Sequence, residues 1–316
     1  MLSSTADHLF WMARYTERAE NTARMLDIHL QSSLLAGGRT ETQRGKAAQA
    51  LLAISELEPS FAGTKKALTS DNVLRFMVAD TGNASSIASA LYAARENARA
   101  VRGAITTELF ETVNVTWLEL QTRLAGDAWV ADMAAFFEWV KHRAHLTRGV
   151  SSGTMPRDDA YRFVALGTAL ERADNVARLL DVKFFEGGEA QVEIDWDAKG
   201  EFYHWAAILR SVSGFEIYRK TYRDNITPAR VAELLILRAD MPRSLMAAVN
   251  ALCNQLQRLA NKRSGQTLRQ AGLLQAQIQY GDIDEILKYG LHKYLTRFLD
   301  GINQIGRGIS QDFLVS

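Results

Sequence analysis

The chain has 316 residues, of which 47% are hydrophobic, and its 37 basic and 36 acidic side chains leave a formal net charge of +1. This balance excludes a broad positive field for nucleic acid or anionic lipid. The single cysteine, Cys253, excludes a disulfide framework or a cysteine metal cluster within one chain. No stretch approaches the ~18 uninterrupted apolar residues of a membrane span. Residues 1–14 lack the basic and then apolar order of a signal peptide. We therefore expect a cytoplasmic protein that binds neither nucleic acid nor membrane.

Taken in chain order, the apolar spacing predicts helices and no convincing strand. The expected helices lie at about 4–35, 43–57, 70–79, 83–110, 112–125 and 129–149, and then at about 157–186, 199–222, 228–238, 242–262, 266–280 and 283–312. The breaks between them are rich in glycine, proline or asparagine, and residues 59–63 form one of these breaks. Of the four prolines, Pro156, Pro228 and Pro242 are expected in the first turns of helices. The sequence thus predicts an all-α helical bundle of about twelve helices.

The chain contains an internal repeat. Residues 17–28 and 171–182 align with eight identities in twelve positions, and the remaining four pairs are conservative. The match continues near the ends of the two halves, where residues 148–151 align with residues 307–310. This pattern predicts one all-α domain, residues 1–316, made of two tandem six-helix repeats at about 1–153 and 154–316. Two copies of one fold are expected to pack about a pseudo-twofold axis.

The repeated helix carries charges among large apolar side chains. On a helix of 3.6 residues per turn, Glu17, Asn21 and Arg24 share one face. The helix is apolar over much of its circumference, which indicates that it is mostly buried. Buried charges must be paired or bound to a ligand.

The first interpretation of these charges is a salt-bridge lattice. In both copies an acid precedes an arginine by four residues, which is the favourable orientation on a helix. These pairs are Glu20 with Arg24 and Asp174 with Arg178. Pairs between the copies, Glu17 with Arg172 and Arg18 with Glu171, could complete the lattice.

The second interpretation is a ligand site between the copies. Two carboxylates near two guanidinium groups could hold a peptide or an amino acid by both ends. The candidate ligand-binding residues on the repeated helix are Arg18, Asn21, Arg24, Arg172, Asn175 and Arg178. A metal site is not expected, because no histidine has the spacing used in di-iron bundles and the arginines would repel a cation. No cofactor is expected.

A different signal appears on the predicted helix 83–110. Arg95, Arg99 and Arg102 are spaced i, i+4 and i+7, with Asn97 beside them, and the second copy lacks these arginines. The stripe is either a solvated basic face or a site for a carboxylate or phosphate.

Several of these motifs together resemble the alpha-E family, a bacterial all-helical domain with a Glu-Arg motif. The resemblance rests on residues 15–21, 93–99, 157–174 and 241–244, and it covers essentially the whole chain. It implies a setting of peptide-bond synthesis or peptide modification, since family members occur beside circularly permuted ATP-grasp proteins, transglutaminase-like proteins and a proteasome-like peptidase. The functional residues that the resemblance implies are Glu17, Arg18, Asn21, Arg24, Arg95, Asn97, Arg99, Glu171, Arg172 and Arg178.

Three hypotheses about function follow. The first is a non-ATP-binding accessory or peptide-binding partner of an ATP-grasp peptide ligase, because the sequence has no phosphate-cradling glycine loop. Its partners would be the ligase, a small acidic peptide, or both, and the chain could form a homo-oligomer. The second is an enzyme that acts on the peptide product with Glu17 or Glu171 as general acid or base. The third is a purely structural interaction module.

Overall fold

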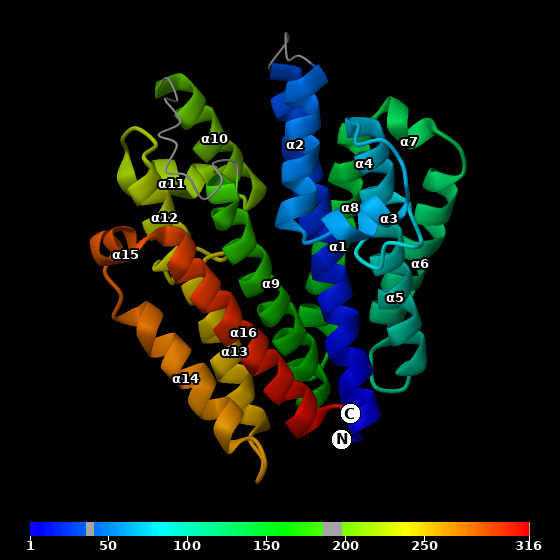
Figure 1. Ribbon diagram of the computed structural model, residues 1–316. Coiled ribbons are helices and arrows are strands. Elements are labelled where there is room, and N and C mark those ends of the chain that lie inside the picture. The colour runs from blue at the N-terminus through cyan, green and yellow to red at the C-terminus, as the bar shows by residue number, and fades with distance from the viewer. Residues whose placement is uncertain (36–40, 186–197, 316) are drawn as a thin grey trace. The chain divides into compact units, whose positions relative to one another are not determined.

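The computed structural model of the protein describes residues 1–35, 41–185 and 198–315, and within these ranges every regular element is a helix (Figure 1). The helices are α1 (Ser3–Leu35), α2 (Glu41–Ile54), α3 (Glu58–Gly63), α4 (Ser70–Val78), α5 (Ile87–Ala100), α6 (Thr107–Leu124), α7 (Ala128–Ala131), α8 (Met133–Thr154), α9 (Asp159–Phe185), α10 (Ala198–Ser211), α11 (Phe215–Tyr222), α12 (Pro228–Ile236), α13 (Leu245–Leu259), α14 (Gly265–Gln279), α15 (Ile283–Tyr289) and α16 (Leu291–Phe313). The all-α prediction is confirmed. Among the residues described, none of these helices combines the length and the hydropathy that crossing a membrane would require.

Many of the helices begin where the sequence supplies a side-chain cap. Ser86 caps α5 by accepting a hydrogen bond from the backbone N–H of Ser89, and Thr106 caps α6 in the same way through Leu109. Thr227 caps α12, and Pro228 then occupies its first turn as predicted. Capping therefore explains locally why these helices start where they do.

The prediction of about twelve helices is too low, because several expected helices are interrupted. The expected helix 83–110 starts only at Ile87 and ends at Ala100, and a turn separates it from α6. Breaks at Asp132, at residues 212–214 and at Gly290 divide three other expected helices. Asp132 caps α8, and Gly290 has a φ of +104°, a conformation that favours glycine.

Of the three prolines expected in first turns, only Pro228 lies in one. Pro59 lies in the first turn of α3, so the expected break at residues 59–63 is instead a short helix. Pro156 and Pro242 precede α9 and α13 by three residues, and their predicted first-turn positions are wrong. A proline outside a helix restricts the backbone without starting the helix.

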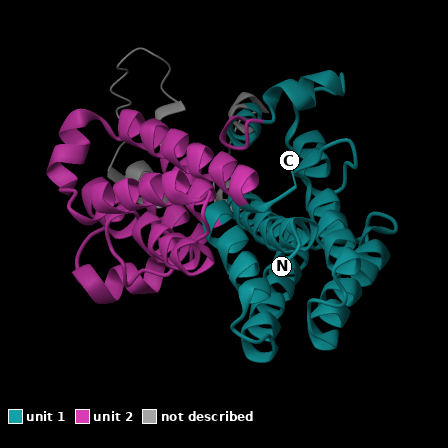
Figure 2. Ribbon diagram, turned by 90° about the horizontal axis from the view of Figure 1, so that it is seen from below, with its two compact units in different colours: residues 1–52, 57–171, 313–316 teal, residues 53–56, 172–312 magenta. Residues whose placement is uncertain are grey.

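The chain forms two compact units (Figure 2). Unit 1 contains residues 1–52, 57–171 and 313–316, and unit 2 contains residues 53–56 and 172–312. The boundary between Glu171 and Arg172 falls inside α9. The tandem repeat with a boundary near residue 153 stays a prediction.

In unit 1 the long helix α1 packs along both α5 and α8. Small side chains make this close packing possible, and Ala19 and Ala23 are fully buried. Next to them lies an aromatic cluster in which the Phe136 ring contacts those of Trp129 and Phe137. This apolar core fixes the face that α1 turns toward α8, and thus the position of its charges.

In unit 2 the helices α13 and α14 form a packed pair, and α12 contacts both α13 and α15. The core includes Leu252 and Tyr218, which are fully buried. The Tyr218 hydroxyl donates to the backbone oxygen of Asn225 and accepts from the N–H of Thr227. This buried tyrosine thereby holds the loop that leads into α12.

Candidate functional site

The first copy of the repeated motif forms a buried ionic network between α1 and α8 in unit 1. Glu20 is fully buried and Glu17 is 1% exposed. Arg148 Nη1 donates to Glu17 Oε2 at 3.0 Å and also contacts Glu20, while Arg24 Nε donates to Glu20 Oε1 at 2.9 Å. His145 Nε2 lies 3.2 Å from Glu20 Oε1 and 3.1 Å from Arg24 Nη2. We call Glu17, Glu20, Arg24, His145 and Arg148 the Glu20 network.

The ionic contacts between α1 and α8 continue beyond this network. Lys141 is buried, and its Nζ donates to Asp27 Oδ2 at 2.8 Å and to Glu138 Oε1 at 2.6 Å. The hydrogen bond from Lys141 is the main reason that the pKa of Glu138 is lowered. The polar face of α1 is therefore matched by charges on α8 over several turns.

The second motif glutamate, Glu171, also lies in unit 1, at the boundary in α9, and it is 3% exposed. Arg14 Nε donates to its Oε2 at 2.7 Å and Arg18 Nε donates to its Oε1 at 2.6 Å. The predicted pair between Arg18 and Glu171 is confirmed. The Arg14 guanidinium carbon also lies 4.7 Å from the ring centroid of Trp11, which keeps this arginine extended toward Glu171.

A glycine brings the first part of α9 close enough to α1 for these contacts. A Cβ at Gly167 would lie 2.3 Å from the backbone oxygen of Phe10. Glu171 follows Gly167 by one helical turn, and Arg14 follows Phe10 by one turn. The close approach of the two backbones thus places Glu171 opposite the arginines of α1.

The two arginines keep Glu171 ionised. Burial alone would raise its pKa, but the charges and hydrogen bonds of Arg14 and Arg18 outweigh burial, and the pKa of Glu171 is lowered. A carboxyl with a lowered pKa does not hold a proton near neutral pH. This arrangement disfavours Glu171 as a general acid.

Substitution of Glu171 by glutamine tests this electrostatic account. Because the folded-state pKa lies below the ordinary value of 4.5, the stability from Glu171 is present above that pH and is lost as pH falls through the folded-state pKa. We expect Glu171→Gln to lower the free energy of unfolding by about 3 kcal/mol at pH 7 and by much less near pH 3. Urea denaturation at both pH values measures the difference. An equal loss at the two pH values would contradict the ionic role.

The second copy of the motif continues along α9 into unit 2. Arg178 Nε donates to Asp174 Oδ2 at 2.7 Å, as predicted, and Arg178 Nη1 lies 2.5 Å from Glu56 Oε1. Burial would lower the pKa of Arg178, but these two acids outweigh it and raise that pKa. The predicted pair between Glu20 and Arg24 is confirmed in unit 1 as well. Both copies therefore contain the same acid and arginine pair, one turn apart.

Three other motif residues also lie on these two helices. Asn21 is buried in α1, and Arg172 and Asn175 are half-buried in α9. Further along α9, Asp181 Oδ1 lies 2.7 Å from His292 Nδ1 in α16. Burial is the main reason that the pKa of Asp181 is raised.

The prediction that Arg95, Arg99 and Arg102 share one face of a helix is wrong for Arg102, because α5 ends at Ala100. Arg102 lies in the following turn, with its guanidinium carbon 4.7 Å from the Phe110 ring centroid. Arg95 contacts Glu96, and Arg99 Nη2 donates to Glu96 Oε2 at 2.6 Å. The two helical arginines are thus turned toward a carboxylate of their own helix.

Asn97 and Arg95 link α5 to its neighbours. Asn97 Oδ1 lies 2.8 Å from His8 Nδ1 on α1, and Arg95 Nε donates to Asn114 Oδ1 on α6 at 3.1 Å. These contacts tie three helices together, which is a structural role for two of the predicted binding residues.

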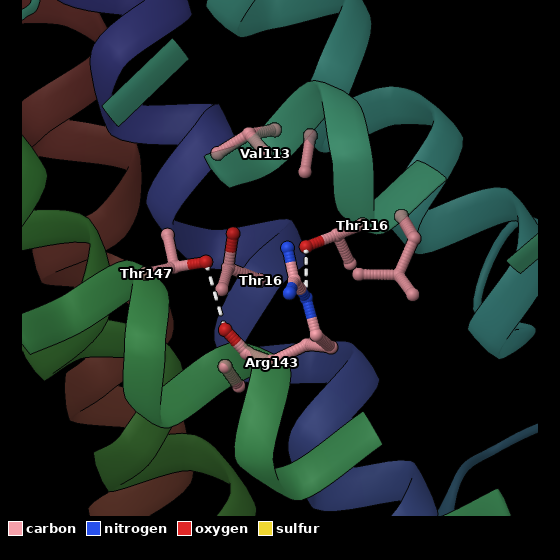
Figure 3. A pocket seen from close by; sticks show the side chains of 8 residues that line it. Thr16, Val113, Thr116, Arg143 and Thr147 are labelled. Atoms are coloured by element: carbon pink, nitrogen blue, oxygen red, sulfur yellow. Dashed lines mark hydrogen bonds between the residues drawn. The ribbon is translucent and has the colours of Figure 1, made fainter. Parts of the chain in front are cut away.

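A small cavity lies between α1, α5, α6 and α8 of unit 1 (Figure 3). Arg143 lies at its wall and donates from Nε to Thr116 Oγ1 at 2.8 Å, with Thr16 and Thr147 nearby. Its volume of about 10 Å³ is close to that of one water molecule. This cavity has no room for a peptide or an amino acid.

Sequence reasoning missed four residues that complete the ionic contacts: Arg14, Lys141, His145 and Arg148. A signal existed for Arg148, because it belongs to a repeated segment, and for Arg14, because it precedes Arg18 by one turn. The counterpart of Arg148, Arg307, is exposed and forms no ion pair with any residue described here. Over the same described ranges, no three histidine, cysteine or acidic side chains are grouped so as to hold a metal ion.

Comparison with known proteins gives one result. A family model called Alpha-E, described as a predicted alpha-helical domain with a conserved ER motif, matches residues 1–314. Glu-Arg pairs occur in this chain at residues 17–18 and 171–172. No curated protein and no solved structure matches the chain.

Proposed function

The chain belongs to the Alpha-E family, and from this membership we propose that it is a non-ATP-binding partner of an ATP-grasp peptide ligase in the cytoplasm. In this role it binds the ligase, the small peptide that the ligase makes, or both. We also propose that its fold is a tandem repeat of two helical halves, with more helices than the six per half expected from the sequence, and the repeated residues 17–28 and 171–182 support the duplication.

The main support for this proposal is the burial and ion pairing of the two motif glutamates. Glu17 and Glu171 are both buried, Glu17 is bound by Arg148, and Glu171 is bound by Arg14 and Arg18. Removing one member of a buried ion pair costs about 3–5 kcal/mol, so these carboxylates hold the helices in place. A motif devoted to the scaffold supports a role other than catalysis, which is either binding or that of a purely structural interaction module.

The enzymatic alternative, with Glu17 or Glu171 as acid or base, requires a carboxyl that exchanges a proton next to a substrate. The lowered pKa of Glu171 speaks against its acting as a general acid. No geometry among the described residues favours the enzymatic alternative over binding.

Mixing the purified chain with its cognate ATP-grasp ligase tests the proposal. We expect size-exclusion chromatography with light scattering to show a complex, and we expect the rate of peptide formation by the ligase to change when the chain is added. Each protein run alone provides the reference and reveals any homo-oligomer. If no complex forms, the ligase rate is unchanged and calorimetry detects no binding of the product peptide, the proposal is wrong.

The same mixture separates binding from catalysis. The product peptide incubated with the chain alone should stay unchanged. Turnover that disappears in Glu17→Gln or Glu171→Gln, while circular dichroism shows a folded variant, would instead establish the enzymatic role.

A further inference from the structure

One segment of unit 2 has an unusual charge. Between Asp240 and Asp282 the chain has no acidic residue, yet it has five basic ones. Four of them, Arg258, Lys262, Arg263 and Arg269, lie at the connection between α13 and α14. We call these four residues the basic turn.

The basic turn lies at the end of the helix pair α13 and α14 where the two helices are connected. α13 and α14 pack against each other, and Figure 1 shows the connection between them at one end of the pair. Arg258 lies in the last turn of α13, and Arg269 lies in the second turn of α14. All four side chains of the basic turn are exposed.

The connection is held in one conformation by its own hydrogen bonds. Asn261 Oδ1 accepts from the backbone N–H groups of Arg263 and Ser264, at 2.8 Å and 3.0 Å. The Ser264 hydroxyl in turn accepts from the N–H of Asn261 at 2.9 Å, and Ser264 is fully buried. A preorganised surface loses less conformational entropy when a partner binds.

The adjacent helix α16 adds one more exposed cation. Gly308 of α16 faces Thr267 of α14, since a Cβ on that glycine would lie 2.2 Å from Thr267 Oγ1. Arg307 therefore lies beside the start of α14, and it is exposed. The acid at this place is Asp312, which is half-buried and accepts a hydrogen bond from Thr267 Oγ1 at 2.6 Å. Positive charge thus exceeds negative charge around the turn.

These cations form no ion pair with any other described residue, and the Arg258 side chain bonds only to the Asn254 amide oxygen. Since unpaired surface charge of one sign attracts a complementary partner, the charge of the turn predicts an acidic ligand.

We propose that the basic turn is the docking surface for an acidic segment of the ligase, and this inference rests on the proposed function because it specifies the chemistry by which the ligase binds. A nucleic acid fits less well, because α13 and α14 contain no aromatic side chain on which bases could stack.

Fluorescence anisotropy with a labelled peptide of ten glutamates tests the docking surface directly. We expect the Arg258→Glu, Lys262→Glu, Arg263→Glu triple variant to bind this peptide at least about tenfold more weakly than the unaltered protein at low salt. The matched control, Lys288→Glu, Lys293→Glu, Arg297→Glu, changes the net charge equally with exposed side chains of α15 and α16. It should change binding by less than about threefold if the turn is the site.

Each outcome of this test is informative. Equal losses in the two variants, no binding of the peptide by the unaltered protein, or tighter binding of a ten-nucleotide single-stranded DNA would overturn the inference. The same variants are then mixed with the ligase. A complex that forms regardless of the basic turn would refute the docking surface but not the proposed function. If the glutamate peptide binds through the basic turn but no ligase complex forms, the turn is still an acid-binding surface and the ligase partnership is refuted.

Discussion

Replacement of Gly167 by alanine is expected to lower the free energy of unfolding by about 3 kcal/mol, because the added methyl group overpacks a site where two backbones already touch. The new Cβ would lie 2.3 Å from the Phe10 carbonyl oxygen and 3.3 Å from the Ala13 Cβ. Backbone atoms cannot rotate away as a flexible side chain can. The helices α1 and α9 would have to separate, and the separation would also lengthen the contacts of Glu171 with Arg14 and Arg18.

A second glycine provides a matched control for this measurement. Gly149 lies within α8, and a Cβ there would meet nothing within 4 Å. Gly149→Ala should therefore be neutral or should stabilise the protein by up to about 1 kcal/mol, through the better helix propensity of alanine. Urea denaturation of both variants gives the comparison. A Gly167→Ala protein as stable as Gly149→Ala would show that the close approach of α1 and α9 is not required.

Replacement of Glu20 by glutamine is expected to cost about 4 kcal/mol, in the range found when one partner of a buried ion pair is removed. Glu20 is fully buried and contacts Arg24, His145 and Arg148. The glutamine keeps the volume of the side chain but leaves two guanidinium groups with less compensating charge. Chemical denaturation followed by circular dichroism measures the loss.

Glu138 supplies the control for Glu20, because it also pairs with a cation of α8 but is more than half exposed. Glu138→Gln should cost less than about 1 kcal/mol, as is usual for surface ion pairs. If the two substitutions cost the same, burial does not determine the strength of the Glu20 network.

The sequence was most informative where the structure depends on contacts within one helix. The pairs of Glu20 with Arg24 and of Asp174 with Arg178 follow from their spacing alone. The start of α5 at Ile87 lies four residues after the expected start, and the capping residue Ser86 is the local signal that marks it. Helix ends such as Ala100 were harder to predict, since apolar periodicity continues through the turn that follows.

Most contacts between helices that are distant in the chain could not be predicted from the sequence. Nothing in the spacing of α8 shows that Arg148 reaches Glu17 and Glu20, because the relative rotation of two helices depends on how their apolar faces pack. The sequence repeat does not predict which arginines are paired. Arg148 is bound to two acids, while its counterpart Arg307 is exposed.

The composition of unit 1 has a consequence for how the protein is made. The Phe163 and Phe313 rings lie with centroids 6.0 Å apart, and both belong to unit 1, although almost all of unit 2 lies between them in the chain. During synthesis Phe163 leaves the ribosome long before Phe313. The core of unit 1 therefore stays incomplete while unit 2 is translated, and its apolar surface needs protection from aggregation during that interval. Closing this contact is a late event, because it joins residues separated by a long stretch of chain.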